Sequence, residues 1–95
     1  MQTVEVNGVT LAYAETGRGS DTVFVHGIPT DHRAWEAQTG PFSEKTHVIT
    51  YSRRHAQPNS NGGNLRDSTI DNNAMDLAGL IRKTTSPPIN LIGHS

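Results

Sequence analysis

The segment Thr22–Pro29, TVFVHGIP, decides how the rest of the chain is organised. Its first half is a short, continuous run of apolar and β-branched residues, which is typical of a strand buried on both faces of a parallel sheet. Glycine directly after such a strand lets the backbone turn without a Cβ clash, and Pro29 stiffens the exit. The segment therefore predicts a central strand that ends abruptly in a loop.

Two further segments predict strands of the same kind. They are His47–Tyr51 and Ile89–Ile92, and a helical segment precedes each of them. The first helix is expected within residues 30–45, beginning near Asp31 and limited by Gly40-Pro41. Strands that alternate with helices imply right-handed crossovers and a mostly parallel sheet.

The second helix has the clearer pattern, because its apolar residues recur with helical spacing and predict one buried stripe. These residues are Ile70, Ala74, Leu77, Ala78 and Ile81. Ser68 or Thr69 can cap the start of the helix, and Ser86-Pro87-Pro88 ends it. The nearby aspartates are expected at the helix start and on the protein surface: Asp67, Asp71 and Asp76.

The N-terminal residues predict a β-hairpin. Asn7-Gly8 tolerates the two positive φ angles of a type I′ turn. With a two-residue loop, Val6 faces Val9 and Val4 faces Leu11, so turn chemistry and apolar pattern agree. The whole chain is therefore expected to have an α/β fold, an N-terminal β-hairpin followed by βαβαβ parallel strands flanked by helices.

Composition limits the possible function classes. With 95 residues the chain makes at most one small domain, and its net charge of −1 argues against a nucleic-acid surface. The sequence has no cysteine, which excludes thiolate catalysis and cysteine-based zinc sites. Its histidines show no i, i+3 or i, i+4 pair, so no metal site is expected and no cofactor is indicated.

The location and partners can also be inferred from the sequence. The N-terminus lacks the basic and apolar segments of a signal peptide, and no apolar run approaches the roughly 18 residues of a membrane span. We therefore expect a cytoplasmic protein whose partner is a small-molecule substrate, with no role for nucleic acid or membrane.

The C-terminal triplet Gly93-His94-Ser95 directly follows a predicted strand. A nucleophile elbow needs a strand, then a tight turn that exposes the serine, with small residues on both sides. Gly93 supplies the first small residue, and the second would lie two residues after Ser95. The triplet alone is more often a strand end with a solvated serine, so it requires a second signal.

The second signal is the loop His26-Gly27-Ile28-Pro29. Acyl transfer builds negative charge on a carbonyl oxygen, which backbone N–H groups can stabilise in a dry site. The N–H of Ile28 is a candidate donor, although for this loop by itself an ordinary strand exit with a packed histidine is the preferred interpretation. Because parallel strands bring their carboxyl ends to one edge of a sheet, we expect this loop to converge with Ser95.

The hairpin, the His-Gly-x-Pro after the third strand and the strand-Gly-His-Ser resemble, in this order, the first half of an α/β-hydrolase-fold enzyme. The resemblance covers essentially all 95 residues and implies that they are the N-terminal portion of a single α/β-hydrolase domain. It implies that Ser95 is the nucleophile and that Ile28 gives one oxyanion N–H. It further implies that His26 and Gly27 shape the oxyanion loop.

The resemblance also implies which chemistry to expect. The catalytic acid, the catalytic histidine and the second oxyanion donor should lie beyond Ser95. A serine there, where most epoxide hydrolases and haloalkane dehalogenases use aspartate, favours ester, amide or C–C bond hydrolysis. Without a base a serine hydroxyl is a weak nucleophile, so these residues alone should be inactive. The alternative is a non-catalytic hydrolase-fold protein that binds a small ligand, or a truncated product without function.

Residues 52–67 predict a long surface loop, and here the chain departs from the resemblance. Many relatives place an Asp-x-Arg-Gly-x-Gly-type run where this chain has Tyr51–His55. Arg53 and Arg54 could contact a substrate or form a solvated pair, and the solvated pair is the preferred interpretation. Trp35 could line a pocket, but packing of the first helix is the simpler role for it.

Overall fold

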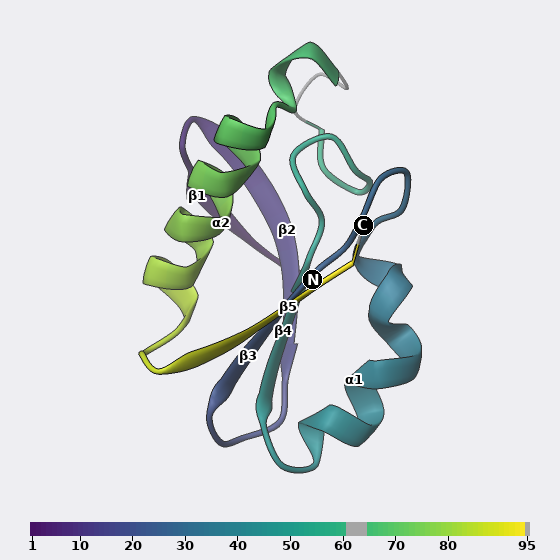
Figure 1. The fold of residues 1–95 in the computed structure, drawn as a ribbon, viewed down its shortest axis with the longest axis vertical. Helices are drawn as coiled ribbons and strands as arrows, with labels where there is room; N and C mark the ends of the chain where they lie inside the picture. Colours follow the sequence, from purple (N-terminus) through teal and green to yellow (C-terminus); the bar gives the residue numbers. More distant parts are fainter. Residues whose placement is uncertain (61–64, 95) are drawn as a thin grey trace.

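The computed structural model describes residues 1–60 and 65–94. Within these residues the chain forms one five-stranded sheet with the strand order β1-β2-β4-β3-β5 (Figure 1). The strands are β1 (Gln2–Val6), β2 (Val9–Thr16), β3 (Asp21–Val25), β4 (His47–Tyr51) and β5 (Ile89–Gly93). The helices are α1 (Glu36–Ser43) and α2 (Ile70–Thr84), with the 3₁₀ turns η1 (His32–Trp35) and η2 (Leu65–Asp67).

The sheet has an antiparallel part and a parallel part. β1 pairs antiparallel with β2, and β2 pairs antiparallel with β4. β3 lies between β4 and β5 and is parallel to both. This confirms the predicted α/β fold, a hairpin followed by parallel strands that alternate with helices.

The hairpin forms as its turn residues require. Asn7 has φ 48° and Gly8 has φ 78°, the two positive angles expected for a type I′ turn. The register pairs Val6 with Val9 and Val4 with Leu11, so the predicted apolar face of the ribbon is confirmed.

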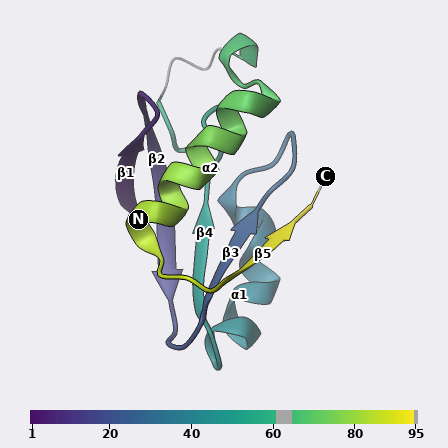
Figure 2. The ribbon, with the colours of Figure 1, turned by 60° about the vertical axis from the view of Figure 1, so that its left-hand side comes forward.

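One helix covers each face of the sheet (Figures 1 and 2). Side chains alternate between the two faces of a strand, so consecutive residues of β3 point to different helices. On the α2 side, Val23 belongs to a buried cluster with Val6, Leu11, Ile49, Tyr51 and Leu80. On the α1 side, Phe24 packs against Trp35 and Phe42, with ring centroids 4.8 and 5.3 Å apart. Trp35 thus packs the first helix onto the sheet.

The prediction that Gly40-Pro41 limits the first helix is wrong, because α1 continues to Ser43. A proline inside a helix removes one backbone donor, but the contact of Phe42 with Phe24 holds this last turn onto the sheet. The expected start is confirmed, since the Asp31 carboxylate accepts the N–H of Arg33 and caps η1.

The predicted apolar stripe of α2 is only partly correct. Leu77 and Ile81 pack against the buried cluster, but Ile70 is 87% exposed and Ala74 is also exposed. The cap is as expected, because the Thr69 hydroxyl accepts the N–H of Asn72.

The helix faces the sheet along a different line, through Asp76, Gly79 and Leu80, which are all buried. A Cβ at Gly79 would lie 2.9 Å from the Cβ of Val6, so glycine permits an approach to the hairpin that other residues would block. Ile70 and Ala74 belong to the first turns of α2, where they line an open cavity and do not reach the core.

Candidate active site

The carboxyl ends of the parallel strands meet at one edge of the sheet. Val25, the last residue of β3, pairs in register with Gly93, the last residue of β5. The carbonyl of Val25 then accepts the N–H of His94 at 3.1 Å. The loop that starts at His26 and the segment that leads to Ser95 therefore lie side by side, while Ser95 itself lies outside the described residues.

His26 is a buried connector between two loops of this edge. Its Nε2 accepts the backbone N–H of Arg53 at 2.8 Å, and its Nδ1 lies 2.7 Å from the carbonyl oxygen of Gly27. A backbone N–H can only donate, so Nε2 is the acceptor and the proton sits on Nδ1, which donates to Gly27. Burial lowers the pKa of His26, and the Arg53 charge acts in the same direction. Both ring nitrogens of this neutral histidine are occupied.

The remainder of the loop is a tight turn in which, among the described residues, the Gly27 carbonyl is paired and the Ile28 N–H is not. The carbonyl of Gly27 accepts the N–H of Thr30 at 3.2 Å and its hydroxyl at 2.9 Å. Pro29 follows a cis peptide bond, and the side chain of Ile28 is 59% exposed. No acceptor in residues 1–60 or 65–94 binds the N–H of Ile28.

An open cavity of about 690 Å³ lies at this edge on the α2 side of the sheet. Gly27 and Ile28 line it from the β3 loop, Arg53 from the β4 loop, and Gly93 and His94 from the end of β5. Its volume is in the range of small-molecule sites. Segments distant in sequence thus share one cavity, where the binding site of an α/β sheet is expected.

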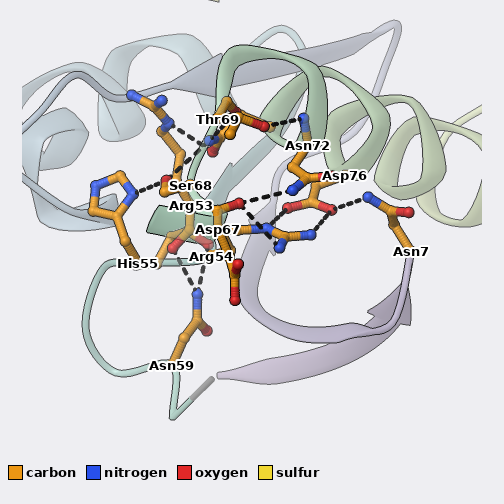
Figure 3. A network of polar contacts seen from close by, with 12 residues as sticks. Asn7, Arg53, Arg54, His55, Asn59, Asp67, Ser68, Thr69, Asn72 and Asp76 are labelled. Atoms are coloured by element: carbon orange, nitrogen blue, oxygen red, sulfur yellow. Dashed lines mark hydrogen bonds and ion pairs between the residues drawn. The ribbon is translucent and has the colours of Figure 1, made fainter. Parts of the chain in front are cut away.

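The prediction of a solvated Arg53–Arg54 pair is wrong for Arg54. Its side chain is 9% exposed and forms two hydrogen bonds with Asp76, 2.7 Å from Nε to Oδ2 and 2.9 Å from Nη2 to Oδ1 (Figure 3). The amide of Asn7, in the hairpin turn, donates to the same carboxylate at 3.0 Å. Arg54 is therefore a buried structural cation that joins the hairpin, the β4 loop and α2.

The surface position expected for Asp76 is wrong for the same reason, since Asp76 is 1% exposed. A signal was present in the sequence, because Asp76 is four residues before Leu80 and thus shares its helix face. A carboxylate on a buried face needs a cation, and Arg54 supplies it.

Arg53 has a different environment from its neighbour. Its Nε donates to the side-chain oxygen of Asn73 at 3.0 Å, and Nη1 lies 3.5 Å from the carbonyl of His26. These contacts hold the guanidinium group between α2 and the His26 loop, beside the cavity. The sequence reasoning named Arg53 as a possible substrate contact but gave no position for it and missed Asn73.

A second histidine lies beside this group. His55 Nδ1 is 2.7 Å from the hydroxyl of Ser68, and its ring is 6.1 Å from the ring of His26 (Figure 3). Burial and the Arg53 charge lower the pKa of His55. The part of the chain that the structure describes holds no group of three His, Asp or Glu residues arranged for a metal ion.

Comparison with curated proteins gives two hydrolase relatives, whereas no protein-family model matches the chain. The AB hydrolase superfamily protein YfhM of Bacillus subtilis is 32% identical over 98% of this chain and 34% of the relative. The (E)-2-((N-methylformamido)methylene)succinate hydrolase of Acinetobacter baylyi is 30% identical over 94% of this chain and 33% of the relative.

Solved structures give a closer view of the fold. An epoxide hydrolase from Bacillus megaterium superposes with a TM-score of 0.89, 28% identity, and coverage of 99% of this chain and 33% of that one. The chain has a partial α/β-hydrolase fold. An epoxide hydrolase from Vigna radiata agrees with this assignment, with a TM-score of 0.90 and 26% identity over 99% of this chain and 31% of that one.

The resemblance to the α/β-hydrolase family is therefore confirmed. The chain spans about a third of the length of the curated relatives it matches. None of the helices in the described residues is long and apolar enough to cross a membrane.

Proposed function

We propose that this chain belongs to a hydrolase of the α/β-hydrolase superfamily in which Ser95 is the nucleophile. The observation that carries the proposal is the parallel register of β3 and β5, which pairs Val25 with Gly93. This register brings the Ile28 loop next to the residues that precede Ser95 in the sequence. The curated relatives are hydrolases, which supports the same reaction class.

The proposed reaction is hydrolysis of an ester, an amide or a C–C bond next to a carbonyl. The Ser95 hydroxyl attacks the carbonyl carbon, and the unbonded N–H of Ile28 donates to the oxygen on which charge develops. His26 and Gly27 hold this donor in place, and Pro29 and Gly93 shape the two turns. The bond to the alcohol, amine or carbon leaving group then breaks, and that group departs with the proton that the serine hydroxyl lost. Water hydrolyses the acyl-serine to a carboxylic acid and the free serine.

His26 is not available as the base for Ser95. His26 cannot take a proton, because its Nε2 already accepts the N–H of Arg53. The catalytic acid and histidine are proposed to follow Ser95, in the order of the α/β-hydrolase triad. Residues 1–95 alone are then inactive.

The main alternative to ester or amide hydrolysis is epoxide hydrolysis, the reaction of the structural neighbours. An epoxide hydrolase of this fold was crystallised with the diol (R)-3-[1]naphthyloxy-propane-1,2-diol, its product. The aspartate typical of epoxide hydrolases at the elbow position is a serine here, which favours acyl transfer. A small-molecule substrate and a cytoplasmic location are parts of this proposal, and the sequence contains no sign of a cofactor.

The test is active-site labelling of the full-length protein with a fluorophosphonate probe. We expect one label per chain, mapped to Ser95 by peptide mass spectrometry, and none in the Ser95→Ala variant. Ser86→Ala is the matched control, because Ser86 lies beyond the other end of the sheet, and it should label normally. A folded protein that does not label would contradict the proposal and favour the non-catalytic, ligand-binding alternative.

A further inference from the structure

The three arginines closest to the candidate site differ in how their charges are compensated. Arg33 forms an ion pair with Asp31 at 2.7 Å, and Arg54 forms one with Asp76 at 2.7 Å. Arg53 has no carboxylate within ion-pair distance among the residues whose positions the structure gives. It is therefore an uncompensated cation at the edge of the cavity.

The contacts of Arg53 orient its guanidinium group without neutralising it. Asn73 is uncharged and binds only Nε, and the contact of Nη1 with the His26 carbonyl is long, at 3.5 Å. Nη2 binds no atom in residues 1–60 or 65–94. A guanidinium that is fixed at Nε and open at its outer edge suits the bidentate recognition of a carboxylate.

The rest of the cavity lining strengthens the attraction between the Arg53 charge and an anion. Apart from the polar partners of Arg53, much of its lining is apolar and includes Val25, Leu77 and the buried ring of Tyr51. Burial raises the pKa of Tyr51 to about 12, so the phenol stays neutral and offers no negative charge to Arg53. A cation beside apolar walls attracts an anion more strongly than a cation in open water does.

We propose that Arg53 binds a carboxylate group of the substrate, so that the enzyme prefers small esters or amides that carry a negative charge. The inference rests on the proposed hydrolase function, because Ile28 and Arg53 line the same cavity. The apolar walls hold the body of the substrate, and Arg53 fixes its charged end. Arg53 thus determines specificity and takes no part in the bond-breaking step.

The experiment compares two esters on the full-length protein. The mono-p-nitrophenyl ester of glutaric acid carries a free carboxylate, and p-nitrophenyl pentanoate has the same acyl length without it. The wild type should prefer the charged ester. Arg53→Gln should raise KM for that ester about tenfold to hundredfold, the value of a hydrogen-bonded charge, and leave kcat/KM for the neutral ester unchanged.

Two further variants make the result specific to Arg53. Arg53→Lys keeps the charge but loses the planar fork, so it should recover part of the preference. Arg82→Gln removes an arginine from the exposed side of α2 and should change neither ester. Equal effects of Arg53→Gln on both esters, or a wild type without preference, would overturn the proposal.

A binding measurement separates this inference from the proposed reaction. If neither ester is cleaved and Ser95 does not label, the hydrolase proposal fails, and glutarate binding still tests Arg53. Glutarate should shift the Nε–Hε resonance of Arg53 in a saturable way, while pentanol at equal concentration should not. An unchanged resonance would overturn the role of Arg53.

Discussion

The polar groups at the amino ends and at the carboxyl ends of the parallel strands differ in how they are paired. At the amino edge, Asp21 Oδ1 lies 2.7 Å from His47 Nδ1, and Oδ2 accepts the N–H of Ser86 at 2.8 Å. Glu15 lies 3.8 Å from the other nitrogen of His47. At the carboxyl edge, the N–H of Ile28 has no acceptor and Arg53 has no anion among the described residues.

This difference distinguishes the polar groups that stabilise the fold from those that can bind a ligand. Polar groups that serve only folding find their partners in the same chain, because an unpaired buried group is costly. Groups that lack partners at an edge where three loops converge are available to a ligand. The amino edge is therefore expected to affect stability alone, and the carboxyl edge to affect stability and binding through different residues.

The largest expected effect comes from the buried ion pair beneath the carboxyl edge. Asp76→Ala removes the carboxylate that compensates Arg54, and a buried charge that loses its partner typically destabilises a protein by about 3–5 kcal/mol. Urea denaturation of the variant measures this loss. The control is Asp71→Ala on the exposed first turn of α2, which should cost less than about 1 kcal/mol. Equal midpoints for the two variants would refute the structural role of Arg54.

A smaller effect, with a distinct pH dependence, is expected for His26→Ala. The substitution leaves the Arg53 N–H without its acceptor and removes one of the donors to the Gly27 carbonyl, at a cost of about 1–3 kcal/mol. The folded protein holds His26 neutral with a lowered pKa, so the unfolded chain binds a proton more readily. The wild type should therefore lose stability as the pH falls below about 6.5, and the variant should lose less, because only the contribution of His55 remains.

Thermal melts between neutral and mildly acidic pH measure this difference, with His94→Ala as the exposed control. A wild-type curve parallel to that of His26→Ala would show that His26 is not held neutral by the fold.

The smallest effect is expected at the amino edge, for Asp21→Asn. The N–H of Ser86 lowers the pKa of Asp21, and His47 acts in the same direction. Because folding lowers this pKa, the Asp21 carboxylate stabilises the folded state at pH values above the unfolded pKa of about 3.9. This stabilisation is lost as the pH falls through the lower pKa of the folded state. The variant should be about 1 kcal/mol less stable at neutral pH, and the difference should shrink as the pH falls through the lowered pKa of Asp21.

This variant also tests the comparison of the edges directly. Asp21→Asn should leave ester preference and Ser95 labelling unchanged. A change in either would show that the amino edge is coupled to the site.

Local signals in the sequence predicted the fold well. Asn7-Gly8 demands a specific turn, and the apolar runs before His26 and Gly93 mark strands whose ends must share an edge. The exposure of Ile70 and Ala74 was not predictable from the spacing in α2, because that spacing does not reveal the open cavity that these two residues line. The apolar stripe therefore misplaced Ile70.

The candidate site was predicted less completely. Arg54 and Asp76 are adjacent in space but 22 positions apart in sequence, and no local rule pairs them. The position of Arg53 follows from its contacts with His26 and Asn73, which lie 27 and 20 positions away in the sequence, so it became visible only in three dimensions. The roles of Ser95 and Ile28 stay predictions that labelling and kinetics must test.

The contact between Asn7 and Asp76 has a consequence for the order of folding. The hairpin precedes α2 in the chain and therefore emerges before it during synthesis, and its Asn7-Gly8 turn is a local structure. Its attachment must wait, because Asn7 binds a residue 69 positions later and Glu5 accepts a bond from Lys83, 78 positions later. Contacts of such long range close slowly. A nascent chain should thus carry a formed but undocked hairpin until α2 has been made.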